Sequence, residues 1–213
     1  MKVGVLASGG GTNLQSLIDH WQQGTLRPAE LAVVGVNVAE AAALERAAKA
    51  DIPTFVLSHK SFATREDFDR ALAAEVRGRG VELIVLAGFM RVLTPAFLDV
   101  FPHRVINIHP ALLPSFPGTH AQKQAIDYGA KLSGCTVHFV DAGTDTGPII
   151  AQAAVPVLPG DDEESLGKRI LAEEHRLLPA VVAAVASGKV KVEGRRVNVA
   201  ASPALAEARL RTL

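Results

Sequence analysis

KVGVLASGGGTNLQSL, residues 2–17, decides the fold class, because it joins a short apolar run to a glycine-rich loop and then to an amphipathic pattern. The run at 2–7 has the length and composition of a buried strand, and the pattern from about Asn13 to Gln23 has helical spacing. A strand, a tight glycine loop and a helix in this order are typical of the start of a β-α-β unit. The stretch therefore predicts an α/β protein whose first strand belongs to a parallel sheet.

The same alternation of apolar runs and helical patterns continues along the chain. It predicts a doubly wound, mostly parallel sheet of about seven strands with helices on both faces. The expected strands are 2–7, 30–38, 54–57, 81–88, 104–109, 132–140 and 148–157, and the expected helices are 13–23, 39–50, 63–80, 94–101, 119–129 and 163–186.

Several local signals refine these boundaries. Thr64 precedes a helix with acids in its first turn and is expected to cap it, and Thr94 followed by Pro95 is typical of the start of a short helix. The tail KVKVEGRRVNV, 189–199, alternates Val with polar residues around Glu-Gly, which predicts an exposed hairpin. No linker, repeat or low-complexity stretch divides the chain, so we expect a single domain over 1–213.

Composition excludes several classes of protein. Lys plus Arg equals Asp plus Glu at 22 each, so a formal net charge of zero predicts neither a nucleic-acid nor a membrane partner. Cys135 is the only cysteine, which excludes an intrachain disulfide and favours a cytoplasmic protein. The apolar run at the N-terminus is too short for a signal sequence. Because no His, Cys, Asp and Glu cluster has metal-ligand spacing, we expect no metal.

The glycine loop is a candidate phosphate site, since a helix N-terminus offers N–H groups and positive potential. Gly9 and Gly11 match the first two glycines of the dinucleotide fingerprint, but Leu14 occupies the third position. The second strand ends near Asn37 instead of an acid, so an NAD site is not expected. No Gly-Lys-Ser/Thr follows, which excludes a Walker loop. A phosphate monoester or simple nucleotide is favoured, and a tight turn without a ligand is the alternative.

A second unusual stretch is VINIHPALLPSFPG, 105–118. Because side chains alternate on a strand, Asn107 and His109 share one side near its carboxyl end, where open α/β sheets bind ligands. An amide beside an imidazole can stabilise an oxyanion and move a proton. The alternative is a structural pair in which His109 bonds a loop carbonyl. We favour the catalytic interpretation.

A carboxylate partner for this histidine is available in VDAGTDTGPII, 140–150. Asp145 beside His109 would orient the ring and stabilise its charged form. Turn formation is an equally good reason for an acid in such a loop, and the residues alone leave the two open.

Glu174 is unusual because it falls within the apolar stripe of the long helix. It either reaches a polar pocket or marks a locally exposed part of the stripe, and the sequence leaves both open. His175 is expected to be solvated. Among the other histidines, His120 is a modest ligand candidate, and His138 lies in a strand and could be core, whereas His20, His59 and His103 are expected at the surface or in loops.

Taken together, these motifs resemble the folate-dependent formyltransferases, in particular the phosphoribosylglycinamide formyltransferase (glycinamide ribonucleotide transformylase) branch. The resemblance covers nearly all of residues 1–200. It implies a Rossmann-like fold, with 1–100 mainly the ribotide and phosphate half and 101–200 mainly the folate and catalytic half. The residues that carry it are ASGGGTNLQ, LAGFMRVLTPAFL, INIHPALLPSFPGTHA, GCTVHFVDAGTDTGPII and EEH.

The resemblance implies transfer of the formyl group of 10-formyltetrahydrofolate, as co-substrate, to the amine of glycinamide ribonucleotide in purine biosynthesis. It implies that Asn107, His109 and Asp145 are catalytic. Ribotide binding maps to Gly11, Thr12, Asn13 and Glu174, and folate binding maps to Arg65, Met90, Arg91, Val92, Leu93, Asn107, Asp141, Ala142, Gly143, Thr144 and Asp145. Two departures from the family pattern are mild: Thr12 replaces a common Ser, and Thr146 stands where some members have Gly.

Rival functions remain at this point. Methionyl-tRNA formyltransferase carries an added C-terminal domain and formyltetrahydrofolate hydrolase an added N-terminal one, and neither is expected in a chain with these ends. A silent folate or nucleotide-binding module would lack a catalytic residue, whereas all three are present. We expect a cytoplasmic monomer or homodimer that acts on small molecules.

Overall fold

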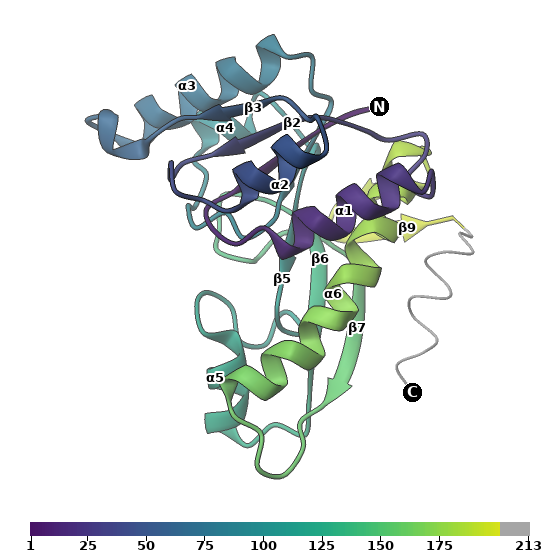
Figure 1. Ribbon diagram of the computed structural model, residues 1–213. Helices are drawn as coiled ribbons and strands as arrows, with labels where there is room; N and C mark the ends of the chain where they lie inside the picture. The colour runs from purple at the N-terminus through teal and green to yellow at the C-terminus, as the bar shows by residue number, and fades with distance from the viewer. Residues whose placement is uncertain (201–213) are drawn as a thin grey trace. The chain divides into compact units, whose positions relative to one another are not determined.

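The computed structural model describes residues 1–200, and the chain divides into two compact units, 1–107 and 108–213 (Figure 1). The boundary falls within strand β5 (Val105–His109). The order of strands is β3-β2-β1-β4-β5-β6-β7 in a seven-stranded sheet, with a separate two-stranded sheet of β8 and β9. The doubly wound, mostly parallel architecture is confirmed. The last dozen residues, for which the sequence predicts no role, lie outside the described range.

The first unit is wholly parallel and is built around a buried central strand. β1 is flanked by β2 and β4, and all of its residues after Lys2 are buried. Helices α1 and α2 pack on each other and on β2, while α3 packs against α4 on the other side of the sheet (Figure 1). The elements are β1 (Lys2–Ala7), α1 (Thr12–Gln22), β2 (Glu30–Val36), α2 (Ala43–Lys49), β3 (Thr54–Val56), the 3₁₀ helix η1 (His59–Ser61), α3 (Arg65–Gly78), β4 (Leu83–Leu86) and α4 (Pro95–Leu98).

The strand order of this unit contains a topological switch point. The chain proceeds from β1 through β2 to β3 and then returns to place β4 on the opposite side of β1. The loops that leave the carboxyl ends of β1 and β4 therefore diverge, which is where open α/β sheets bind ligands. The glycine loop and residues 87–93 leave β1 and β4 at this point.

The second unit consists of an antiparallel strand pair covered by a long helix. α6 packs on both β6 and β7, and its apolar stripe is buried. A reciprocal capping box between Asp162 and Ser165 starts α6 at the residue that the sequence predicts. The elements are α5 (Ala121–Tyr128), β6 (Leu132–Phe139), β7 (Ile149–Pro156), α6 (Glu163–Ala186), β8 (Val190–Glu193) and β9 (Arg196–Val199).

The second predicted helix begins later than expected. The alanine-rich pattern predicts a start at about residue 39, but α2 starts at Ala43. The N–H of Ala43 donates to the carbonyl of Gly9 at 3.2 Å, so its first turn is tied to the glycine loop. This tertiary contact overrides the helical propensity of the preceding residues.

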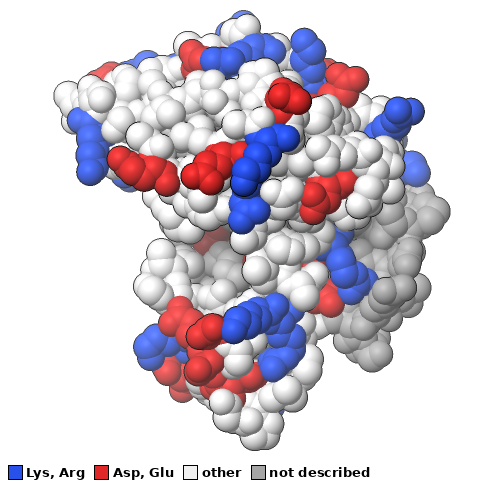
Figure 2. Space-filling model, in the orientation of Figure 1, with Lys and Arg blue, Asp and Glu red and all other residues white. Residues whose placement is uncertain are grey.

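The surface carries charges of both signs. Figure 2 shows Lys and Arg interspersed with Asp and Glu on the face drawn, in keeping with the zero net charge. Within residues 1–200, the helices are all too short or too polar to cross a bilayer.

The two predicted helix caps differ in chemistry. The Thr64 hydroxyl accepts the N–H of Asp67 at 3.1 Å, so Thr64 caps α3 as expected. Thr94 has the N-cap position of α4 with Pro95 at N1, but its hydroxyl makes no capping bond. The buried carboxylate of Asp69 accepts the Thr94 N–H instead, at 2.6 Å. The Thr94 hydroxyl is buried without a partner among the described residues.

The same substitution at these two threonines is expected to have different effects on stability. Thr64→Val removes a capping acceptor and should lower the free energy of unfolding by about 0.5–2 kcal/mol. Thr94→Val replaces an unpaired buried hydroxyl with a methyl group and should not lower it. Urea unfolding of both variants beside the wild type measures the difference, and an equal loss at both sites would contradict this assignment of the caps.

Candidate active site

His109 is the last residue of β5, and it is almost fully buried. Its Nε2 lies 2.9 Å from the Phe116 carbonyl oxygen, and its Nδ1 lies 3.3 Å from Oδ2 of Asp145. The carbonyl can only accept, so Nε2 carries a proton in this arrangement. A second proton on Nδ1 would produce an imidazolium facing a carboxylate. His109 thus makes the loop-carbonyl contact of the structural alternative, and it also makes the contact with Asp145 that the sequence leaves open.

Asp145 is held in place by three groups around its carboxylate. It adopts a left-handed conformation with φ of 55°, which is uncommon for a residue other than Gly. Oδ2 accepts the backbone N–H of Gly118 at 2.8 Å, and Oδ1 lies 3.7 Å from Nε2 of His138. Burial disfavours the charged carboxylate, but His138, the Gly118 N–H and His109 together outweigh burial and lower the pKa of Asp145. The side chain is therefore an anion against His109 at neutral pH.

His138 is a functional candidate that the sequence reasoning missed. It is buried in β6 as a core residue would be, but its ring lies against Asp145, and its Nδ1 lies 2.9 Å from the Phe139 carbonyl. The available signal was a histidine near the end of a mostly apolar strand, three residues before the first acid of the 141–147 loop.

The two acids of the loop at 141–147 have different roles. Oδ1 of Asp141 accepts the N–H of Gly143 at 3.1 Å and the hydroxyl of Thr146 at 2.6 Å. Asp141 thus performs the turn-forming role, and Asp145 directs its carboxylate to the histidines. Gly147 is required here, because a Cβ would lie 1.8 Å from the Phe139 carbonyl oxygen.

The glycine loop of the first unit has the features expected of an anion site. Gly11 occupies the N-cap of α1 with φ of 68°, and no side chain caps that helix. Added Cβ atoms at Gly9 and Gly10 would meet open space, so the loop presents its backbone outward. Thr12 is exposed and Asn13 is buried in the first turn of α1.

Arg46 adds a cation to this loop, and the sequence reasoning did not identify it. Its Nε donates to the Gly10 carbonyl at 2.8 Å, and its Nη1 donates to Oε1 of Gln15 at 3.1 Å. Its position on α2 becomes meaningful only once the fold brings α2 against the loop. A guanidinium, an uncapped helix N-terminus and an open loop together favour a phosphate group.

Hydrogen bonds also join the glycine loop to the segment after β4. The Ser8 hydroxyl accepts the Met90 N–H at 2.8 Å and donates to Oδ1 of Asn37 at 2.6 Å. Arg65 donates to the Val92 carbonyl at 2.7 Å. The structure thus brings Arg65 to the 90–93 segment, which follows β4.

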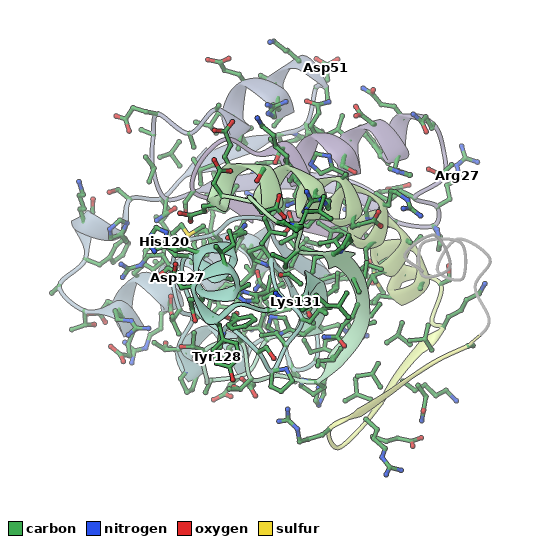
Figure 3. The ribbon with its side chains drawn as sticks, turned by 90° about the horizontal axis from the view of Figure 1, so that it is seen from below. Arg27, Asp51, His120, Asp127, Tyr128 and Lys131 are labelled. Carbon is green, nitrogen blue, oxygen red and sulfur yellow. The ribbon has the colours of Figure 1, made fainter. Side chains whose placement is uncertain are left out.

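The structure also locates four other residues that the sequence singles out, and it contradicts two of the expectations about them. Glu174 is buried, with 6% of its surface exposed, so the locally exposed alternative is wrong. His175 is partly buried and its Nε2 is buried, so the prediction of a solvated ring is wrong. His120 lies at the start of α5 (Figure 3), and its exposed ring pairs with Glu163 at 3.1 Å. Asn107 is half-buried on β5, two residues before His109.

These groups define what the site can do chemically. An amide, and on the same strand an imidazole that lies against a carboxylate, can donate to an oxyanion and transfer a proton. Within residues 1–200, we find no cluster of His, Cys, Asp and Glu with the geometry of a metal site.

The lowered pKa of Asp145 makes a prediction about stability. A carboxylate whose native pKa lies below its ordinary value of 3.8 stabilises the native state at higher pH, and this stability is lost as the pH falls through the depressed native pKa. In urea unfolding, the free energy of unfolding of the wild type should therefore exceed that of Asp145→Asn by a constant amount from about pH 7 to 5. This difference should shrink below about pH 4. Exposed Asp99→Asn is the control, and an advantage that stays constant to low pH would contradict the prediction.

The chain is similar to a protein family and to several proteins of known identity. Residues 1–182 match the family model described as formyl transferase. The phosphoribosylglycinamide formyltransferase of Mycobacterium tuberculosis (strain ATCC 25618 / H37Rv) is 51% identical over 191 residues, which cover 90% of this chain and 87% of that protein. The trifunctional purine biosynthetic protein adenosine-3 of Drosophila pseudoobscura pseudoobscura is 53% identical over 193 residues, which cover 89% of this chain but only 14% of that longer protein.

Solved structures agree with these matches. The crystal structure of glycinamide ribonucleotide transformylase 1 from Symbiobacterium toebii has a TM-score of 0.92 and 49% identity, with 94% of each chain covered. The phosphoribosylglycinamide formyltransferase from Coxiella burnetii has a TM-score of 0.88 and 39% identity, with 93% of each chain covered. The chain therefore belongs to the formyl transferase family, among the phosphoribosylglycinamide formyltransferases.

Proposed function

We propose that the chain transfers the formyl group of 10-formyltetrahydrofolate to the amine of glycinamide ribonucleotide. The observation that carries the proposal is the pairing of His109 with the ionised carboxylate of Asp145 at the end of β5. Asn107 precedes His109 by two residues on the same strand. The proposal is further supported by the family membership and by the identity to phosphoribosylglycinamide formyltransferases.

In the proposed reaction the ribotide amine attacks the formyl carbon directly, without a covalent enzyme intermediate. A C–N bond forms, the formyl oxygen becomes an oxyanion, and the bond from that carbon to N10 of the folate then breaks. The proton lost by the amine replaces the formyl group on N10, so protons balance overall. Holding amine and formyl group together supplies the proximity that this attack requires.

Within that reaction, His109 and Asn107 have the role of oxyanion donors. The Asp145 carboxylate lies 3.3 Å from Nδ1 and orients the ring for donation to the oxyanion. In the substrate-free structure Nε2 of His109 is bonded to the Phe116 carbonyl, so we propose that this N–H turns to the developing oxyanion. His109, or a water near Asp145, then carries the proton from the amine to N10.

The substrate contacts follow the two groups of residues already described. For the ribotide phosphate we propose the loop and first turn of α1, with Arg46 as an added cation and Glu174 as a ribose partner. Backbone groups of the segment after β4 and of the Asp145 loop are proposed to bind the folate. The full folate set is Arg65, Met90, Arg91, Val92, Leu93, Asn107, Asp141, Ala142, Gly143, Thr144 and Asp145.

The cellular context stays a proposal as well. We propose a cytoplasmic enzyme of purine synthesis that acts as a monomer or homodimer on small molecules, with the folate as its co-substrate. We also propose one functional domain, in which residues 1–100 mainly bind the ribotide and 101–200 mainly carry the folate and catalytic groups. Two features support this setting. The formal net charge is zero, and the lone cysteine, Cys135, is free and buried, as is usual in a reducing compartment.

Replacement of His109 tests the proposed chemistry. His109→Ala should lower kcat of formyl transfer by at least about 10²–10³, the usual effect of losing one oxyanion donor. The rate is followed as deformylated folate appears, with purified variant and wild type at saturating substrates. His20→Ala, on α1, is the control and should retain wild-type kcat. Near-full turnover by His109→Ala would contradict the assignment.

Replacement of Arg46 tests the proposed phosphate site. Arg46→Ala removes a partly exposed cation beside the loop, so KM for the ribotide should rise roughly 10-fold while KM for the folate stays unchanged. Lys49→Ala on the same helix removes an equal charge, and it should leave both KM values unchanged. Equal effects of the two variants would indicate general attraction of the substrate instead of a contact.

A further inference from the structure

The C-terminal hairpin lies outside the residues that match the family model, which end at 182. β8 and β9 pair antiparallel, and the N–H of Ala200 donates to the Lys189 carbonyl at 2.8 Å to close the hairpin. Its four valines are half-buried and alternate with exposed residues. β9 packs against β7, so the hairpin (yellow in Figure 1) lies against the antiparallel strand pair of its own unit.

The turn of this hairpin reaches the loop that carries Asp145. Nη2 of Arg195 donates to the carbonyl oxygen of Thr146 at 3.0 Å. The hydroxyl of Thr146 donates to Asp141 at 2.6 Å. The residue directly after Asp145 is therefore held at its backbone by the hairpin and at its side chain by the loop's own turn.

These two hydrogen bonds of Thr146 lie next to a strained part of the backbone. Asp145 is held at φ of 55°, a conformation that costs free energy for a residue with a Cβ and persists only when its surroundings enforce it. Gly147, on the other side of Thr146, is packed directly against the Phe139 carbonyl and fixes the end of the loop. Between these two points, the Thr146 carbonyl is the backbone group that Arg195 binds.

We propose that Arg195 is a positioning residue that holds the loop so that the Asp145 carboxylate stays against His109. The inference rests on the proposed function for its kinetic consequence, but not for its structural one. Arg195 touches neither reacting atoms nor the Asp145 carboxylate, so it acts through the Thr146 peptide. Because Arg195 is exposed, its bond is weakened by water and the effect should be moderate.

Arg195→Ala, compared with Arg196→Ala, tests the proposal. Both variants remove an exposed arginine from the hairpin, but only Arg195 binds the loop. Arg195→Ala should lower kcat/KM for the folate by about 3- to 10-fold with KM for the ribotide unchanged, whereas Arg196→Ala should match the wild type. Arg195→Lys keeps a donor on a long side chain and should restore part of the loss.

A double-mutant cycle separates positioning from a general effect on folding. Thr146→Val removes the bond to Asp141 while leaving the Thr146 carbonyl for Arg195. If both contacts hold one loop geometry, the fold-loss in kcat/KM for the folate in the double variant should differ from the product of the fold-losses in the two single variants. Strictly multiplicative losses, or equal losses in Arg195→Ala and Arg196→Ala, would overturn the proposal.

Hydrogen exchange of the loop amides supplies a readout that needs no activity. Arg195→Ala should exchange the amides of residues 143–147 faster than Arg196→Ala does, with equal global stability in the two variants. If the wild type transfers no formyl group but this difference is present, the proposed function fails and the positioning role stands. If transfer is normal and the loop exchanges equally in both variants, the positioning role fails alone.

Discussion

The ionised carboxylate of Asp145 is the constraint on which the second unit's site depends. It accepts a backbone N–H from the proline-rich loop and lies against two histidines, one at the end of β5 and one on β6. These contacts keep the group charged despite its burial. Without the Asp145 carboxylate, the ring of His109 would lose the contact at its Nδ1 and keep the Phe116 carbonyl at its Nε2.

The first unit depends on a different constraint, which is the reversal of strand order at β1. The reversal leaves two loops diverging at one edge, and the Ser8 hydroxyl then ties them together through the Met90 N–H. Asn37, at the end of β2, completes this network where a dinucleotide-binding protein would place an acid for the ribose. The same position that argues against NAD in the sequence thus has a structural role in the folded chain.

The fold was predictable because its signals are local. Apolar runs predict the strands, Thr64 caps α3 as its position predicts, and the long helix begins and ends where its pattern predicts. The predictions fail where contacts between distant segments set the start of a helix or its capping group. α2 starts late because Ala43 binds the glycine loop, and Thr94 gives way to Asp69 as the capping group. The periodic spacing of Asn107 and His109 was readable, whereas Arg46 and His138 acquire their significance only from chain segments far away in sequence.

The dependence of folate deformylation on the ribotide tests the central claim most directly. Purified protein is mixed with 10-formyltetrahydrofolate, with and without glycinamide ribonucleotide, and the deformylated folate and the formylated ribotide are both quantified. The account predicts equal amounts of the two products, and no deformylation above a protein-free control when the ribotide is absent. Deformylation that proceeds equally well without the ribotide would assign the site to a hydrolase, and no reaction in either mixture would contradict the formyl-transfer account altogether.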